Sequence, residues 1–172
     1  MRRMLRQSLI AAIAGMSIAL GLASPARSLT ADEAEKVSIL LVELSAELGD
    51  FAYDEEEADR IFDEDEAMNG RIAAAGFTRD SWRTALDATF RGYLATIPND
   101  RFSERLSVPM ERLDSTLTLS DEQKAEIRAS MEEKITEIQL LRAEGADHAE
   151  AVRPHAAALE AVFGAGDLDE DE

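Results

Sequence analysis

The sequence predicts an all-α fold, a single compact bundle of five to seven helices that follows an N-terminal signal peptide. Apolar residues recur at spacings of three and four along most of the chain, which is the period of an amphipathic helix. Several of these runs begin with Ser or Thr, residues preferred at helix N-termini. No long run alternates apolar and polar residues as a half-buried strand would. The chain has no cysteine, so packing has to supply its stability.

The first 26 residues have the pattern of a secretory signal peptide. Arg2, Arg3 and Arg6 precede an apolar stretch at residues 8–23, and small residues follow around Ala26, the preferred cleavage position. The stretch is 16 residues long, whereas a membrane-spanning helix needs about 20, so retention as a membrane anchor is the weaker alternative. We expect export across the inner membrane of a Gram-negative bacterium into the periplasm.

Cleavage leaves residues 27–164 as one α-helical domain and residues 165–172 as a disordered acidic tail. Of 18 basic and 36 acidic side chains, the signal peptide removes three arginines, which leaves 15 against 36 and a net charge of −21. This charge argues against nucleic acids and against anionic membranes as partners of the mature chain, because both attract basic surfaces.

The first helix of the domain begins after Thr30, which forms a capping box with Glu33. Its apolar stripe predicts the burial of Ala34, Val37, Leu41, Leu44, Leu48 and Phe51. The stripe is widened by Ile39, Leu40 and Val42. We therefore expect this helix to be central in the fold.

A second helical run covers residues 55–75. Its apolar positions are Ala58, Ile61, Phe62, Met68, Ile72 and Ala75. Asn69-Gly70 is a candidate break within the run, and Gly76 is placed as a C-terminal cap. The many acidic residues of this run are predicted to form a solvated helix face.

The next helix begins after Thr78, where Phe77 and Trp82 are placed as a hydrophobic staple. Its stripe consists of Trp82, Leu86, Phe90, Tyr93, Leu94 and Ile97, and Pro98 ends it. Most of the aromatic side chains of the mature chain lie in this helix and in the turn before it, so we expect the centre of the core here.

Two short helices are predicted next, at residues 100–106 and from Pro109 onward. The longest predicted helix follows at residues 120–141, where Ser120 and Gln123 form a capping box. Its stripe consists of Ile127, Met131, Ile135, Ile138 and Leu141. Because only one face of this segment is polar, we expect the other helices to pack around it.

The last part of the domain contains a predicted turn at residues 144–146 and a break near Arg153 caused by Pro154. A final helix is predicted at residues 154–163, and Gly164 ends it. Its predicted buried residues are Ala158, Leu159, Val162 and Phe163.

No set of residues in the sequence predicts a catalytic, cofactor or metal site. His148 and His155 are separated by two helical turns and by Pro154, which is too far to chelate one ion. A calcium loop counted from Asp65 lacks carboxylates at its third and twelfth positions. The chain also lacks a cysteine nucleophile and a G-x-S-x-G motif, so we expect no enzymatic activity.

The segment Leu-Ser-Asp-Glu-Gln at residues 119–123 resembles the L-T-x-x-Q motif of the Spy and CpxP family of small helical periplasmic chaperones and stress sensors. Residues 29–33, Leu-Thr-Ala-Asp-Glu, are a looser second copy. The resemblance implies a helical and often dimeric cradle that holds unfolding clients on an apolar concave face.

The chain as a whole resembles a set of exported alphaproteobacterial α-helical proteins of unknown function. Their shared pattern is a Gly-Phe turn before a Trp-containing helix, an L-S-x-E-Q-K segment, and a V-x-P ahead of an L-x-x-x-F ending. The matching residues are Gly76-Phe77 with Trp82, residues 119–124, Val152 with Pro154, and Leu159 with Phe163. This resemblance implies a shared fold and no particular activity.

We therefore expect a periplasmic protein that acts by protein–protein interaction, with a role in envelope stress. The stripes around Leu41 and Met131 are wider than a surface helix needs, so one of them is a candidate surface for a protein partner, an unfolded client or a second copy in a homodimer. Burial of both stripes in the core is the other interpretation. The alternative function is binding of a divalent metal or a small ligand in the periplasm.

Overall fold

All regular secondary structure is helical in residues 28–49 and 55–164, the residues that the computed structural model describes. The elements are α1 (Ala31–Leu48), α2 (Glu55–Met68), α3 (Arg71–Ala74), α4 (Arg79–Thr96), α5 (Asn99–Ser115), α6 (Asp121–Glu144), the 3₁₀ turn η1 (Gly145–His148), α7 (Ala149–Val152), the 3₁₀ turn η2 (Arg153–His155) and α8 (Ala156–Phe163). Six of these helices have eight residues or more and no strand occurs in the two ranges, which confirms the all-α prediction.

Two predicted segments, the signal peptide at residues 1–26 and the tail at residues 165–172, lie outside the described residues. None of the helices in the described part of the chain combines the length and the apolar character that crossing a lipid bilayer requires.

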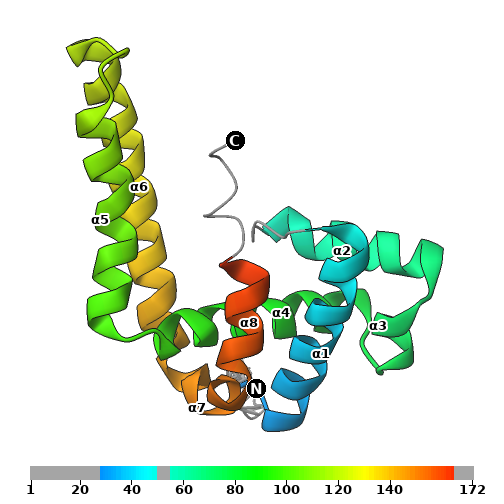
Figure 1. Cartoon of the computed structure of the whole chain (residues 1–172). Coiled ribbons are helices and arrows are strands. Elements are labelled where there is room, and N and C mark those ends of the chain that lie inside the picture. Colours follow the sequence, from blue (N-terminus) through cyan, green and yellow to red (C-terminus); the bar gives the residue numbers. More distant parts are fainter. Residues whose placement is uncertain (1–27, 50–54, 165–172) are drawn as a thin grey trace, which may run out of the picture.

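Helix α4 lies at the centre of the fold, where it packs against α1, α2, α6, α7 and α8 (Figure 1). The predicted cap and staple are both present: Thr78 and Ser81 bond reciprocally, and the rings of Phe77 and Trp82 meet edge to face with centroids 5.8 Å apart. Trp82 is fully buried, and its indole N–H donates to the Ala58 carbonyl of α2 at 3.0 Å. The predicted centre of the core is therefore confirmed.

Helices α1 and α8 pack against each other and against α4 (Figure 1). The Thr30–Glu33 capping box opens α1, which buries Ala34, Val37, Leu40, Leu41 and Leu44. Ile39 and Val42 are 50% and 44% exposed, so the prediction that they widen the buried face is wrong. Neighbours cover one side of α1, and these two residues lie on the other side. Phe51, also predicted in this face, lies outside the described residues.

The helical run predicted at residues 55–75 is divided into α2 and α3 at the candidate break, where Gly70 has a left-handed φ of 62°, and Gly76 follows α3 with a φ of 96°. Asp65 of α2 bridges the break, because its Oδ2 accepts from the Ile72 N–H at 2.8 Å. Its side chain is 1% exposed, so Asp65 is a buried cap of α3 and not part of the predicted solvated face. Met68, predicted on the apolar face, is 47% exposed.

Helices α5 and α6 form a hairpin that projects from the body formed by the other helices (Figure 1). Ser120 and Gln123 make the predicted capping box at the start of α6. No residue of α6 is fully buried, so the prediction that the other helices pack around this segment is wrong. Helix α6 lies against α5 and, near its C-terminal end, against α4, which leaves much of its surface without a protein neighbour.

Helix α5 continues through Pro109, where the sequence predicted two separate short helices. Proline removes one N–H donor, but residues 99–115 contain no glycine and no second proline, so the disruption stays within one turn. Leu113 is buried within the hairpin and outside the main core cluster. The hairpin therefore has an apolar contact of its own.

Close backbone contact joins α4 to the segment after α6. The predicted turn at residues 144–146 is the junction of α6 and η1, where a Cβ atom on Gly145 would lie 1.9 Å from the Arg91 carbonyl oxygen. A Cβ atom on Gly92 of α4 would lie 2.8 Å from the Val152 side chain. Glycine at both positions lets the two segments touch.

The predicted break around Pro154 is present as η2. Helix α8 starts at Ala156, two residues later than predicted, because Pro154 lies in the preceding 3₁₀ turn. Leu159 and Val162 are buried as predicted, while Phe163 is half-buried and Ala158 is exposed.

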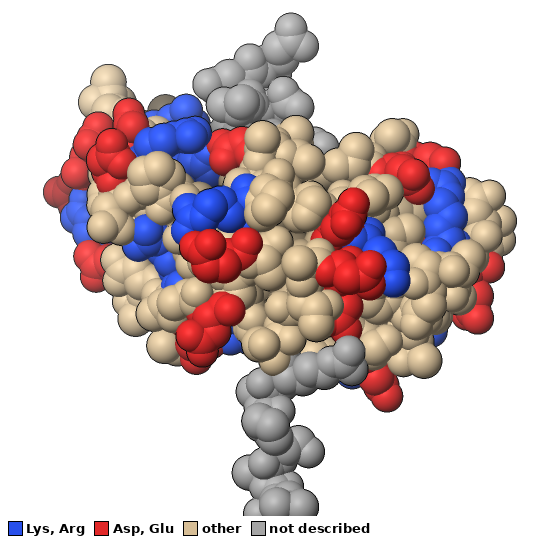
Figure 2. Space-filling view, turned by 90° about the horizontal axis from the view of Figure 1, so that it is seen from below, with Lys and Arg blue, Asp and Glu red and all other residues tan. Residues whose placement is uncertain are grey.

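Charged side chains of both signs are interspersed on the face of the molecule seen in Figure 2. Basic residues there lie among acidic ones and form no continuous basic stripe. Among the described residues, Arg83 pairs with Asp59 at 2.8 Å and Lys36 pairs with Asp32 at 2.8 Å. Most of the basic side chains in the described residues thus form ion pairs with Asp or Glu.

Candidate functional site

An apolar cleft of about 320 Å³ lies where the α5–α6 hairpin meets α4 and α8; we call it the hairpin cleft. Its lining consists of Phe90, Tyr93, Leu94 and Ile97 from α4, Phe102, Arg105, Leu106, Pro109 and Met110 from α5, Met131, Lys134, Ile135 and Ile138 from α6, and Phe163 from α8. Its volume and its mainly apolar lining are typical of sites that bind a small ligand or a few side chains.

One wall of the hairpin cleft is the α6 stripe that the sequence predicted. Met131, Ile135 and Ile138 line the cleft and are half-buried. Leu41, at the centre of the other wide stripe, is fully buried in the core. The structure therefore leaves the α6 stripe as the open one of the two candidate partner surfaces, and covering it would remove apolar area from water.

The floor of the hairpin cleft is aromatic. The ring of Phe163 meets that of Phe90 edge to face, with centroids 5.1 Å apart, and lies 5.6 Å from the ring of Tyr93. Tyr93, Leu94 and Ile97 are buried in the body. A packed floor of this kind holds its shape while the hairpin wall contributes the more exposed side chains.

Both charged residues of the lining, Arg105 and Lys134, are cations, in a chain whose formal net charge is −18. Arg105 forms an ion pair with Glu160 and donates to the Tyr93 hydroxyl at 3.3 Å. Lys134 pairs with Glu137 at 2.8 Å, and its side chain is 71% exposed. The edge of the apolar cleft therefore carries two cations, each of which is paired with a glutamate.

The cluster of Arg105, Tyr93 and Glu160 ties α5 to α4 and α8. Burial raises the pKa of the Tyr93 phenol, which stays protonated at neutral pH and donates to Glu160 at 2.8 Å. Burial by itself would raise the pKa of Glu160, but the hydrogen bond from Tyr93 and the charge of Arg105 outweigh it and hold that pKa below its ordinary value. Glu160 is therefore ionised at neutral pH and anchors the base of the hairpin.

The chemistry of the lining suits binding. It contains no His, Asp, Glu, Ser or Thr, so it does not place a general base beside a nucleophile. Across residues 28–49 and 55–164, no three His, Cys, Asp or Glu side chains are grouped to hold a metal ion.

The two histidines lie in different turns, η1 and η2. His148 Nδ1 accepts a long hydrogen bond of 3.4 Å from the Leu29 N–H, and its Cβ lies close to Gly92 of α4. His148 thus has a packing role, and His155 is half-buried in η2.

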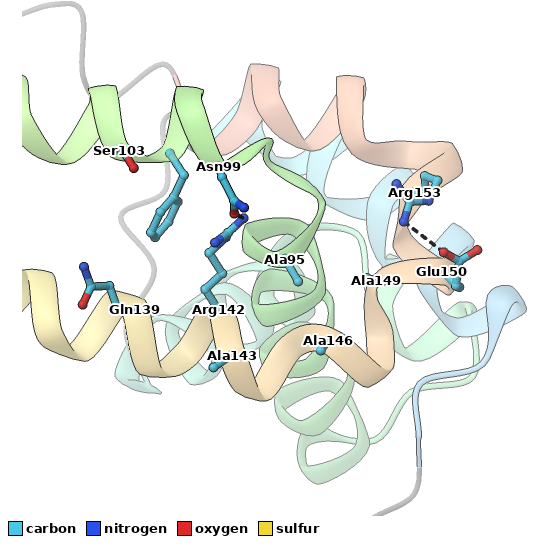
Figure 3. Close-up of a pocket in the computed structure, with 11 residues that line it drawn as sticks. Ala95, Asn99, Ser103, Gln139, Arg142, Ala143, Ala146, Ala149, Glu150 and Arg153 are labelled. Carbon is cyan, nitrogen blue, oxygen red and sulfur yellow. Dashed lines mark hydrogen bonds and ion pairs between the residues drawn. The ribbon is translucent and has the colours of Figure 1, made fainter.

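A larger hollow of about 570 Å³ lies between the base of the hairpin and residues 146–153 (Figure 3). Arg142 points into it toward Asn99, but its guanidinium is engaged. It donates to the carbonyls of Leu94 at 3.1 Å and Ile97 at 2.8 Å and to the Asn99 side chain at 2.7 Å. It also lies 4.4 Å from the centre of the Phe102 ring.

At the other end of this hollow, Glu150 and Arg153 point toward each other and pair at 2.9 Å (Figure 3). Small side chains, among them Ala95, Ala143 and Ala146, cover the space between. Because its charged groups already bind each other or backbone, this hollow is a weaker candidate than the hairpin cleft.

Sequence analysis found part of the hairpin cleft. Periodicity identified Met131, Ile135 and Ile138 as one apolar stripe, and the structure brings them opposite the aromatic face of α4. Arg105 and Lys134 were missed, because a cation beside an apolar stripe occurs on any amphipathic helix. Only the fold shows that these two cations border the same cleft.

Comparison of the chain with known proteins gives no match to a protein-family model, to a curated protein or to a solved structure. The two resemblances indicated by its motifs stay predictions. The geometry of the hairpin cleft is therefore the basis on which a function is proposed.

Proposed function

We propose that the chain is a non-enzymatic binding protein of the periplasm that holds apolar segments of partner or unfolding proteins in the hairpin cleft. The observation that carries this proposal is the half-buried apolar wall of Met131, Ile135 and Ile138, which faces an aromatic floor across an open cleft. Apolar surface of this kind gains about 25 cal/mol for each Å² that a ligand covers.

The form of the cleft favours a protein segment as the ligand. Two helices and an aromatic floor make a groove of the kind that receives the apolar face of a helix or of an unfolded stretch. The periplasmic location and a role in envelope stress belong to the same proposal. The signal-peptide pattern of residues 1–26 and the motif at residues 119–123 support them.

Two substitutions on the same helix test the proposal. Ile135→Asp puts a charge into the cleft wall, whereas Leu140→Asp puts the same charge at a position that is 59% exposed and outside the lining. We expect Ile135→Asp to weaken binding of the neutral apolar dye Nile red by about tenfold or more, because the wall then carries an unpaired charge. It should also reduce suppression of aggregation of a heat-unfolded reporter enzyme, while Leu140→Asp changes neither.

Circular dichroism of both variants checks that the helices are retained. Equal effects of the two substitutions would mean that the cleft is not the binding surface. Loss of helix in Ile135→Asp alone would be resolved with Ile135→Ser, which removes most of the apolar area without adding charge.

Affinity capture separates the two kinds of protein partner. Tagged residues 27–172 are exposed to a periplasmic extract before and after mild heat or acid stress. One stoichiometric partner in both conditions identifies a dedicated adaptor, and a spread of clients that appears only after stress identifies a chaperone. Sedimentation equilibrium of the purified chain tests for a homodimer.

A second candidate is a small amphipathic anion, and the positions of Arg105 and Lys134 at the edge of an apolar cleft favour it. Dodecanoate is a suitable probe, because a ligand that binds the folded state raises the melting temperature. If dodecanoate raises the melting temperature of the unchanged chain but not that of the Lys134→Glu variant, a small amphipathic anion is favoured as the ligand. Metal binding has no comparable support in the described residues.

A further inference from the structure

We propose that the hairpin cleft takes residues 165–172 of its own chain as a resident ligand, with the Leu168 side chain on the apolar floor and the neighbouring carboxylates at Arg105 and Lys134. This inference rests on the proposed function of the cleft as a site for apolar segments. It names the kind of segment that the cleft selects: an apolar side chain flanked by acidic residues.

The connection of the chain favours this ligand. Phe163, the last residue of α8, forms part of the cleft floor, and Gly164 caps the helix. Leu168 follows Phe163 by five residues, so it can reach about 17 Å from the floor at full extension. A segment tethered this closely is present at an effective concentration on the order of millimolar.

The composition of the segment matches the cleft. Residues 165–172 read Ala-Gly-Asp-Leu-Asp-Glu-Asp-Glu, in which Leu168 is the one large apolar residue and five residues are acidic. The cleft has an apolar floor, and both of its charged lining residues are cations. The acidic excess of the chain repels such a segment over most of the surface, whereas the edge of the cleft offers two cations that a further carboxylate can share with Glu160 and Glu137.

The contacts that the cations already make leave room for this attraction. The Lys134–Glu137 pair is exposed on both sides, at 71% and 54%, and exposed pairs of this kind are weak. Arg105 is 29% exposed and holds Glu160, so an arriving carboxylate meets a partly accessible cation. Carboxylates of the segment could thus bind Lys134 and Arg105 while the Arg105–Glu160 ion pair at the base of the hairpin stays intact.

If residues 165–172 occupy the cleft, a foreign ligand must bind with enough affinity to displace them. A partner has to displace Leu168 before it reaches the floor, so only segments with larger apolar faces or higher local concentration would enter. The segment would in this way protect the cleft from weak, non-specific apolar contacts.

Nile red binding to residues 27–172 tests the proposal, because the dye is neutral and reports on the apolar floor alone. Dye binding is compared in unchanged residues 27–172, in the Leu168→Ser variant of this chain and in a shortened chain that ends at Gly164. If the segment covers the cleft about nine-tenths of the time, both changes lower the apparent dissociation constant of the dye by about tenfold. A synthetic peptide of residues 164–172 should displace the dye from the shortened chain, and the same peptide with Leu168→Ser should not.

The charge contribution is tested with a matched pair of lysine substitutions. Lys134→Glu in the shortened chain should weaken peptide binding by about three- to tenfold and affect the peptide more than the dye. Lys36→Glu reverses a charge on α1, outside the cleft, and should leave peptide binding unchanged.

The outcomes separate this inference from the proposed function. Equal dye affinity in unchanged residues 27–172, in Leu168→Ser and in the shortened chain would overturn the resident segment and leave the cleft as a binding site. Displacement by both peptides alike would also overturn it, because Leu168 would then make no contact. Dye binding that Ile135→Asp does not weaken would instead overturn the proposed function itself.

Discussion

Arg142 joins three segments of the chain through one guanidinium group. It projects from α6 and donates to carbonyls of Leu94 and Ile97 at the end of α4 and to the side chain of Asn99 at the start of α5. Carbonyl groups in the last turn of a helix have no partner within that helix, so a charged donor from elsewhere is valuable there. Arg142 thereby fixes the angle between the body and the hairpin.

Replacement of Arg142 by Ala should lower the free energy of unfolding by about 2–3 kcal/mol, because hydrogen bonds from a charged donor are lost and the Ile97 carbonyl loses its donor, whereas the Leu94 carbonyl keeps the Ile97 N–H. Arg153→Ala is the matched control. Arg153 is 59% exposed and pairs with Glu150 one turn away, so its removal should cost at most about 0.5 kcal/mol. Urea denaturation of both variants measures the difference, and similar small losses would show that Arg142 does not stabilise the junction.

The residue-level features that the sequence predicts are the local ones. The caps at Thr30, Thr78 and Ser120 were predicted, because each bonds to a residue three positions away. The roles of Asp65 and Arg142 were not, because their partners are seven and more than forty residues distant. Such partners become visible only when the helices are placed in space.

At the scale of elements, the hairpin of α5 and α6 differs from the rest of the fold. Helix α4 buries eight of its residues, whereas α5 buries two and α6 none. Local stability follows the amount of buried apolar contact, so the hairpin lies at the low-stability end of the molecule. A wall of the cleft that opens at low cost would admit ligands larger than the resting cleft.

Amide hydrogen exchange should therefore be faster in residues 121–135 than in residues 82–94, because the outer part of α6 can open while the body stays folded. Mass spectrometry of the exchanged chain after peptic digestion measures both regions in one sample, so α4 is an internal control. Uniform protection across the two regions would contradict the separate opening of the hairpin.

Element type was predictable from periodicity, but packing was not. The α6 segment has an apolar stripe at regular helical spacing, yet none of its residues is fully buried. Periodicity shows which face is apolar but not which element covers that face. The close approach of η1 to α4 depends on Gly145 and Gly92, which carry no signal of a partner. The cleft could therefore not be predicted as a site, although its α6 wall was predicted as an apolar stripe.

At the scale of the whole molecule, charge opposes folding. The formal net charge of −18 produces self-repulsion that the unfolded chain relieves by expanding. Ion pairs such as Arg83–Asp59 offset it only in part, because both side chains are substantially exposed.

An increase in sodium chloride from about 10 mM to about 500 mM should raise the melting temperature, because screening weakens repulsion over the whole surface more than it weakens exposed ion pairs. Differential scanning calorimetry at pH 7 measures the shift. Sucrose at equal osmolality controls for effects that are not electrostatic. A fall in melting temperature would mean that the ion pairs contribute more than the net repulsion costs.

The tip of the hairpin also makes the molecule easy to observe. Leu117 lies between α5 and α6 and is 95% exposed, and the chain has no cysteine. A cysteine at this position would be the sole thiol, so a fluorophore or spin label could be attached there and nowhere else. Such a label would report in real time whether the hairpin moves when a ligand is added.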